Sequence, residues 1–132
     1  MGKYIDLMAN FLTEDDWSYK TYTAEDGGIF LRSPYAAKHC TFDVVFDASD
    51  SKDWVMIFIY PNIYTPEKYQ HTIAELICRL NQRITLGCFE FDFSENTIRF
   101  RSAIDIEGSE LTSTIFFNLL KSALITMDKS FP

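Results

Sequence analysis

Apolar and polar residues alternate most regularly in two short segments, residues 88–93 and 97–101. A period of two is typical of half-buried β-strands. A two-residue loop at Glu95 and Asn96 would join these strands, since Asn96 tolerates a positive φ. That register pairs Phe93 with Ile98, Phe91 with Phe100, Asp92 with Arg99 and Glu90 with Arg101. We therefore expect a hairpin with apolar pairs facing the core and ion pairs on the other face.

Helical periodicity predicts three helices. The first covers about residues 4–12, where apolar residues recur at intervals of three and four. The second follows Thr65, a good N-cap, and Pro66, which suits the first helical position. Its apolar stripe runs over residues 69–84, and Gly87 follows as a stop. The third covers about residues 110–128, after a turn at Gly108 and Ser109.

The third predicted helix has an unusually wide apolar surface. At about 100° per residue its apolar side chains span roughly 200°, whereas a helix lying on one sheet needs nearer 100°. The excess edge consists of Phe117 and Leu124. Apolar surface beyond what the fold needs usually marks a contact with another chain, so we predict an interaction role for both residues.

Four further strands are predicted before the second helix, at about residues 17–21, 29–32, 41–47 and 54–60. Residues 54–60 are apolar on both faces, so either a helix or another subunit should cover the second face. Trp54 is therefore a third candidate contact residue. The whole chain, residues 1–132, reads as one α+β domain of order α-β-β-β-β-α-β-β-α, with helices packed against an antiparallel sheet.

Composition narrows the possible partners. The chain has 132 residues, 47% of them hydrophobic, and a net charge of −7, without a basic cluster. These values disfavour disorder, nucleic-acid binding and attachment to anionic membranes. The longest apolar run, residues 54–60, is too short to cross a bilayer, and the N-terminus lacks the pattern of a signal peptide. With an odd number of cysteines, we expect reduced thiols and a cytoplasmic location.

Candidate chemistry is sparse. His39 and Cys40 are adjacent, and neighbouring residues of a strand point to opposite faces, so they would not form a nucleophilic pair. Residues 47–53 resemble a calcium loop but lack its central glycine and closing glutamate, and we interpret them as a solvated turn. The acidic run at residues 14–16 lies in a predicted exposed loop. We therefore expect no enzyme activity, no metal and no cofactor.

Several positions resemble those of a known bacterial family. They are Phe11, Leu12, residues 17–19, Leu80, Asn81, Phe89, Phe93, residues 98–101 and Leu111. Over about residues 5–128 the chain resembles the YbjN-domain family, whose members are described as sensory-transduction regulators. The resemblance implies a fold like that of type III secretion chaperones, an antiparallel sheet with packed helices that is commonly dimeric. It supplies no catalytic residues to transfer.

Two hypotheses follow. The first is a non-enzymatic protein-interaction module, chaperone-like or regulatory, that forms a homodimer through the last helix or the sheet face at residues 54–60 and binds an unidentified protein. The alternative is a small-molecule-binding protein or unrecognised enzyme with a pocket between sheet and helices. A pocket lined by Asp43, Asp47 or His39 would favour the alternative, and a closely packed core without one would favour the first.

Overall fold

A computed structural model describes residues 2–38 and 40–131 of the chain. Its elements are α1 (Lys3–Glu14), β1 (Lys20–Thr23), β2 (Ile29–Ala36), β3 (Thr41–Ser49), β4 (Trp54–Tyr60), α2 (Gln70–Asn81), β5 (Cys88–Asp92), β6 (Thr97–Asp105) and α3 (Ser113–Ser130). A short 3₁₀ turn, Glu67–Tyr69, leads into α2. The predicted α+β class and the predicted order of elements are both confirmed.

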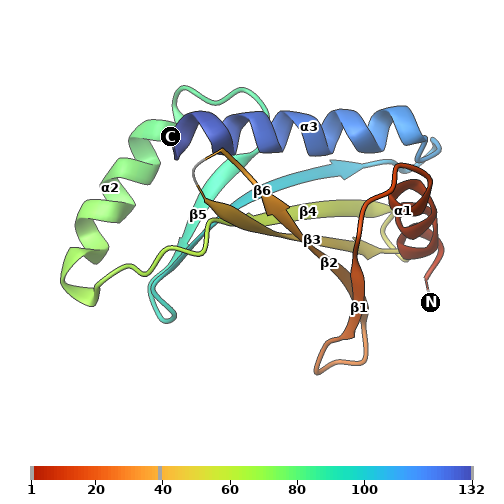
Figure 1. Ribbon diagram of the computed structural model, residues 1–132, viewed down its shortest axis with the longest axis horizontal. Coiled ribbons are helices and arrows are strands. Elements are labelled where there is room, and N and C mark those ends of the chain that lie inside the picture. Colours follow the sequence, from red (N-terminus) through yellow and green to blue (C-terminus); the bar gives the residue numbers. More distant parts are fainter. Residues whose placement is uncertain (1, 39, 132) are drawn as a thin grey trace.

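The strands form one antiparallel sheet in the order β1-β2-β3-β4-β6-β5. All three helices contribute to one layer (Figure 1). Helix α3 runs over β4 and β6, α1 lies against β2 and β3, and α2 lies at the far end against β5. The result is two layers, with one sheet face covered by helices and the outer face left open by every described helix.

Alternation along the strands places the core between these layers. On β3 the residues Phe42, Val44 and Phe46 are fully buried, and on β4 the same holds for Val55, Ile57 and Ile59. Phe116 of α3 packs its ring 5.6 Å from that of Phe46. The intervening residues of β4 point outward, and no described helix covers them. Of the two covers predicted for this strand, a helix is therefore not found among the described residues.

The loop of the β5–β6 hairpin is longer than predicted. Phe89 pairs with Phe100, Glu90 with Arg99, Phe91 with Ile98 and Asp92 with Thr97, so the predicted register is wrong by two residues. The cause is the Asp92 carboxylate, which accepts hydrogen bonds from the Ser94 N–H and hydroxyl and so stabilises a four-residue loop. Asn96 has the expected positive φ, 53°. A slip of two residues preserves the faces of the paired residues, and Phe100 is fully buried as predicted. The prediction is wrong for Phe93, which lies in the loop and is 47% exposed.

Helix α3 begins later than predicted, because Thr112 is its N-cap and accepts a hydrogen bond from the Ile115 N–H. The expected exposed edge is wrong for Leu124, which is only 7% exposed, and Phe117 is half-buried against the Phe116 ring. The helix contacts α1 as well as the sheet, with the Phe11 and Phe116 rings 5.6 Å apart. Helix α1 therefore covers part of the wide apolar arc of α3.

Residues 47–53 do more than form the expected solvated turn. The Asp50 carboxylate accepts hydrogen bonds from the backbone N–H groups of Lys3 (2.8 Å) and Tyr4 (3.3 Å), which begin α1. Because the N-cap residue Gly2 has no side chain, Asp50 supplies the cap from a distant loop. The Tyr4 hydroxyl donates to the Asp53 carboxylate, and this bond raises the pKa of Tyr4 to about 12.

Candidate protein-binding face of the sheet

The outer face of the sheet is built from residues that share a strand with the core but point away from it. Register places Arg32 beside Val45, Val45 beside Phe58 and Phe58 beside Arg101, which gives a row across four strands. Its centre is apolar and each end is cationic. We call this surface, together with the neighbouring outward residues of β2 to β6, the outer face.

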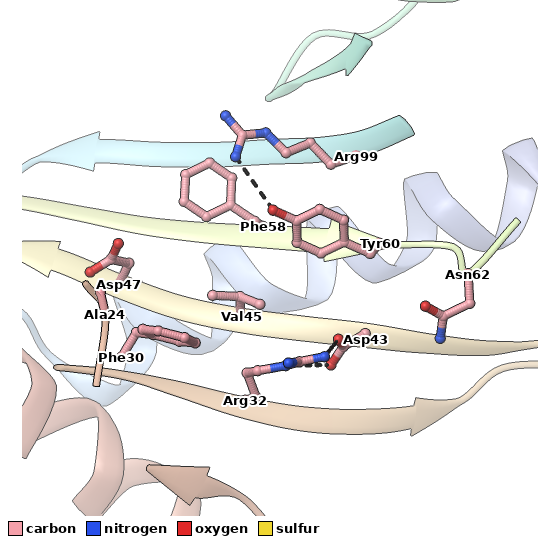
Figure 2. A pocket seen from close by; sticks show the side chains of 10 residues that line it. All are labelled: Ala24, Phe30, Arg32, Asp43, Val45, Asp47, Phe58, Tyr60, Asn62 and Arg99. Carbon is pink, nitrogen blue, oxygen red and sulfur yellow. Dashed lines mark hydrogen bonds and ion pairs between the residues drawn. The ribbon is translucent and has the colours of Figure 1, made fainter. Parts of the chain in front are cut away.

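A hollow of about 480 Å³ lies in the middle of the outer face. Val45 and Phe58 line its centre, and Phe30, Tyr60 and the carboxylates Asp43 and Asp47 also line it (Figure 2). Two of the three polar residues named above for a possible pocket therefore meet here, while His39 lies outside the described residues. The hollow opens on the outer face, whereas the buried core cluster lies between the sheet and the helices.

One wall of the hollow is an ion pair between neighbouring strands. The guanidinium of Arg32 donates through Nε and Nη2 to the two carboxylate oxygens of Asp43. It also lies 5.3 Å from the centre of the Tyr22 ring, a distance that suits a cation–π contact. The hydrogen bonds to Asp43 raise the pKa of Arg32.

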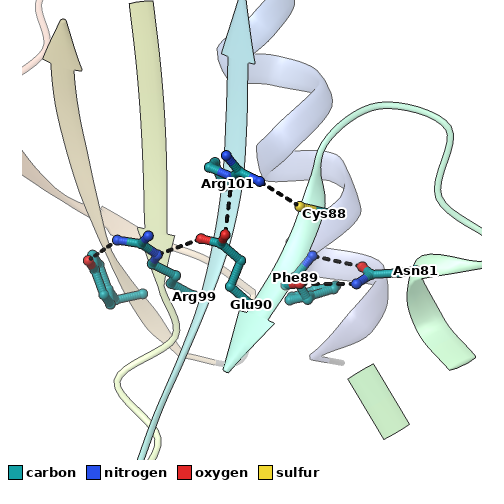
Figure 3. A network of polar contacts seen from close by, with 7 residues as sticks. Asn81, Cys88, Phe89, Glu90, Arg99 and Arg101 are labelled. Atoms are coloured by element: carbon teal, nitrogen blue, oxygen red, sulfur yellow. Dashed lines mark hydrogen bonds and ion pairs between the residues drawn. The ribbon is translucent and has the colours of Figure 1, made fainter. Parts of the chain in front are cut away.

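The opposite wall belongs to a network around Glu90 (Figure 3). Arg99 donates from Nε to Glu90 at 2.7 Å and from Nη1 to the Tyr60 hydroxyl at 3.4 Å, and it lies 4.2 Å above the Phe58 ring. Arg101 approaches the second Glu90 oxygen at 3.2 Å. Partial burial alone would lower the pKa of Arg99, but its hydrogen bonds to Tyr60 and Glu90 outweigh burial and raise it.

The predicted hairpin ion pairs are partly present. Glu90 does pair with Arg101, but diagonally, because Arg99 is the residue directly opposite. Asp92 does not pair with Arg99, since its carboxylate is used in the loop, where hydrogen bonds from Ser94 lower its pKa. One carboxylate therefore holds two guanidinium groups, and both are oriented on the outer face.

The predicted interaction residues do not come together. Trp54 lies on the outer face and is 41% exposed, with the Lys52 ammonium 4.9 Å from its ring. Phe117 and Leu124 lie in the helical layer on the other side of the sheet. The residues that sequence reasoning missed are Phe30 and Arg32, which share alternate positions of β2. The strand signal was present at residues 29–32, but it does not say which face stays uncovered.

A second unusual surface surrounds α2. Ile63, Tyr64, Tyr69 and Leu76 are 45%, 83%, 47% and 50% exposed, and we call them the α2 surface. They border a groove of about 260 Å³ that reaches Phe89 under the helix, and none of the described residues that line it is charged. The sequence did show the apolar stripe of α2. It did not show that only Ile77 of this helix is buried.

Asn81 fixes the position of α2. Its side-chain amide donates to the Phe89 carbonyl at 3.0 Å and accepts from the Phe89 N–H at 2.7 Å (Figure 3). These bonds occupy the free edge of β5 as a neighbouring strand would. Gln70, at the start of the helix, donates to the Phe93 carbonyl at 2.8 Å. The helix is therefore tied to the hairpin at both ends by polar contacts.

The arrangement of the outer face suits binding: fixed guanidinium groups, carboxylates and aromatic rings around an apolar centre. Over residues 2–38 and 40–131, no three His, Cys, Asp or Glu side chains are grouped as a metal site would require. Within the same residues, no helix combines the length and apolar character needed to cross a membrane.

The chain belongs to the YbjN family. The family model, described as "Putative bacterial sensory transduction regulator", matches residues 4–132. No curated protein matches the sequence. The crystal structure of YbjN from E. coli, described as "a putative transcription regulator", is similar with a TM-score of 0.65, 10% identity, and coverage of 95% of this chain and 89% of that one. At that identity the likeness concerns the fold alone.

A second solved structure, the ExsC–ExsE complex, contains a chain with a TM-score of 0.49 and 12% identity. The match covers 98% of this chain and 94% of that chain. The family model identifies the family and the E. coli YbjN structure shares the fold, and the family agrees with the resemblance noted in the sequence.

Proposed function

We propose that this protein is a non-enzymatic interaction module, chaperone-like or regulatory, that acts as a homodimer and binds a partner protein through the outer face. The observation that carries the proposal is a six-stranded sheet whose outer face no described helix covers. Membership of a family described as regulators supports the same reading. The free thiols of Cys40, Cys78 and Cys88 agree with a cytoplasmic location.

The composition of the outer face supports a protein partner. Interfaces are enriched in aromatic residues and arginine, which supply most hot spots. The face combines Phe30, Trp54 and Phe58 with the guanidinium groups of Arg32 and Arg99. Both guanidinium groups are already held by carboxylates, so a partner would meet oriented side chains and less side-chain entropy would be lost on binding.

We propose that the two copies of the homodimer meet at the α2 surface. Nine large hydrophobic side chains are exposed on the described residues, and six of them lie between residues 63 and 93: Ile63, Tyr64, Tyr69, Leu76, Leu86 and Phe93. Protruding side chains and an apolar groove occur in the same patch. Such a patch can be complementary to itself, as a two-fold interface requires.

Light scattering on matched variants separates the two surfaces. At micromolar concentration we expect about twice the chain mass of 15.3 kDa for the natural protein. Leu76→Glu should give a folded monomer, whereas Phe58→Glu, on the outer face, should remain dimeric. A monomeric natural protein would sink the dimer proposal. A monomeric Phe58→Glu beside a dimeric Leu76→Glu would move the dimer contact to the outer face.

Partner binding needs its own experiment. Affinity purification from the native host with mass spectrometry should recover a partner with the natural protein and lose it with Phe58→Glu. Ile125→Glu is the matched control, because Ile125 is 55% exposed on α3, on the other side of the molecule. The same partners with all three proteins would show that the outer face does not bind them.

Small-molecule binding is the second candidate function. The observation in its favour is the hollow lined by Asp43 and Asp47, which was named above as the sign of such a site. A pocket of this volume suits a small ligand, although ligand sites usually enclose more of their ligand than an open sheet face can. Ligand-observed NMR screening should separate the candidates, because a specific small-molecule site predicts hits that compete with one another and disappear in Phe58→Glu.

A further inference from the structure

One combination of groups occurs twice on the outer face: a guanidinium placed above an aromatic ring and paired with a carboxylate. The two sets are Arg99 with Phe58 and Glu90, and Arg32 with Tyr22 and Asp43. In each set the cation comes from this chain and its charge is neutralised locally. The two sets show that this surface can hold a cation between an aromatic ring and a carboxylate.

Asp47 and Phe30 bring a third carboxylate and aromatic ring to the outer face, where both line the hollow. Phe30 and Asp47 adjoin the Leu31–Phe46 pair and both line the hollow, and Asp47 pairs with Met56 on the other side. Among the described residues, the only hydrogen bond to the Asp47 carboxylate comes from the Ala48 N–H at 2.8 Å, and no cationic group lies within ion-pair distance.

The surroundings of Asp47 favour a cation over other ligands. Asp47 is half-buried, and the hollow that it lines has the apolar side chains of Phe30, Val45 and Phe58. The Phe30 ring stacks on Tyr22 at 5.6 Å on one side and lines the hollow on the other. An anion would meet the carboxylate directly, and an apolar group would bury it without a partner. A cation gains both the ion pair and the ring face.

The cations already in the hollow cannot take this role without leaving their own partners. Arg32 is bound to Asp43, and Arg99 is bound to Glu90 and Tyr60. Figure 2 shows Asp47 and Phe30 together at one end of the hollow, apart from the Arg99 guanidinium. A cation that pairs with Asp47 would therefore come from outside the chain.

We infer that the Asp47–Phe30 end of the hollow binds the guanidinium or ammonium group of an arginine or lysine of the partner protein. This rests on the proposed partner binding at the outer face and specifies its chemistry. The net charge of −7 favours a basic partner segment over a second copy of this acidic chain. A cationic anchor between two charged walls also fixes the register of the bound segment.

Short peptides of defined charge test the inference on the full chain. The probe is a blocked pentapeptide, Val-Tyr-Arg-Tyr-Val, compared with versions that carry citrulline or glutamate in place of arginine. Citrulline keeps the shape of arginine and removes its charge. Titrations followed by ¹⁵N NMR should shift the amides of Phe30, Asp47 and Phe58, with affinity at least about tenfold higher for arginine than for citrulline.

A charge-neutral variant locates the effect. Asp47→Asn should abolish the difference between the arginine and citrulline peptides. Asp105→Asn is the control, since Asp105 is an exposed acid on β6 that does not line the hollow, and the difference should persist there. Equal binding of both peptides by the natural protein, or a difference that survives Asp47→Asn, would overturn the cation site while leaving peptide binding to the face intact. Amide shifts confined to other surfaces, or no binding of the arginine peptide, would overturn the cation site as well. The proposed function is tested separately, by the purification with Phe58→Glu described above.

Discussion

Asn81 joins α2 to the edge of the sheet, and replacing it with alanine tests how that helix is held. The substitution removes two hydrogen bonds to the Phe89 backbone, at 2.7 and 3.0 Å. A neutral hydrogen bond contributes about 0.5–1.5 kcal/mol net, so the pair should contribute about 1–3 kcal/mol. Because Asn81 is only half-buried, water can replace part of these hydrogen bonds in the variant. We therefore expect the free energy of unfolding to fall by an amount in the lower half of that range.

Urea unfolding and amide hydrogen exchange measure the two parts of this prediction. Asn81→Ala should lower the free energy of unfolding and speed exchange at the Phe89 N–H, since that group loses its acceptor. Gln82→Ala is the matched control, because Gln82 follows Asn81, is exposed and makes no side-chain hydrogen bond among the described residues. If both variants unfold alike and Phe89 exchanges at its natural rate, then α2 is held by apolar packing alone.

Further predictions concern stability. Phe100→Ala should cost about 3–5 kcal/mol because the ring is fully buried, and Phe91→Ala, at a half-buried site, about 1–3 kcal/mol. Arg99→Ala should cost at most about 1 kcal/mol, since the Arg99 and Glu90 side chains are 38% and 31% exposed; a loss equal to that of Phe100→Ala would reject the face assignment. The raised pKa of Tyr4 predicts a contribution to stability that is complete below pH 10 and is lost as pH rises through about 12. In urea unfolding at a series of pH values, Asp53→Asn should remove this dependence. Dialysis against a chelator should leave thermal stability unchanged, and a drop that calcium or zinc restores would contradict this.

The elements were predictable because their signals are local. Periods of two and 3.6 residues depend on which side of each segment is buried, and those periods survive whatever the neighbours are. The hairpin register was not predictable from alternation, because a slip of two residues leaves the paired side chains on the same faces. The deciding contact was the Asp92 carboxylate with Ser94, a local polar bond that competes with a tighter turn.

Long-range contacts explain the remaining differences. Asp50 caps α1 across 46 residues of sequence, and no local pattern marks it as a cap. The wide arc of α3 suggested an exposed edge, but a second helical neighbour at Phe11 uses part of it. The candidate site was only partly visible, since the doubly apolar β4 signalled an uncovered face. The polar residues around that face are set by the register across β2, β3 and β6. Alternation along a single strand does not determine this register.

The same strands carry the core and the outer face, and this separates stability from binding. On β6, Phe100 is fully buried whereas its neighbours Arg99 and Arg101 are oriented outward by Glu90. Substitutions at outward positions therefore remove little buried apolar surface, so they can change partner binding without unfolding the chain. The α2 surface is separate from both, because the strand that α2 contacts most is the edge strand β5. If the two interfaces are independent, a variant on the α2 surface should change only dimerisation, and a variant on the outer face should change only partner binding. Parallel changes in both would show that the hairpin between the two surfaces couples them.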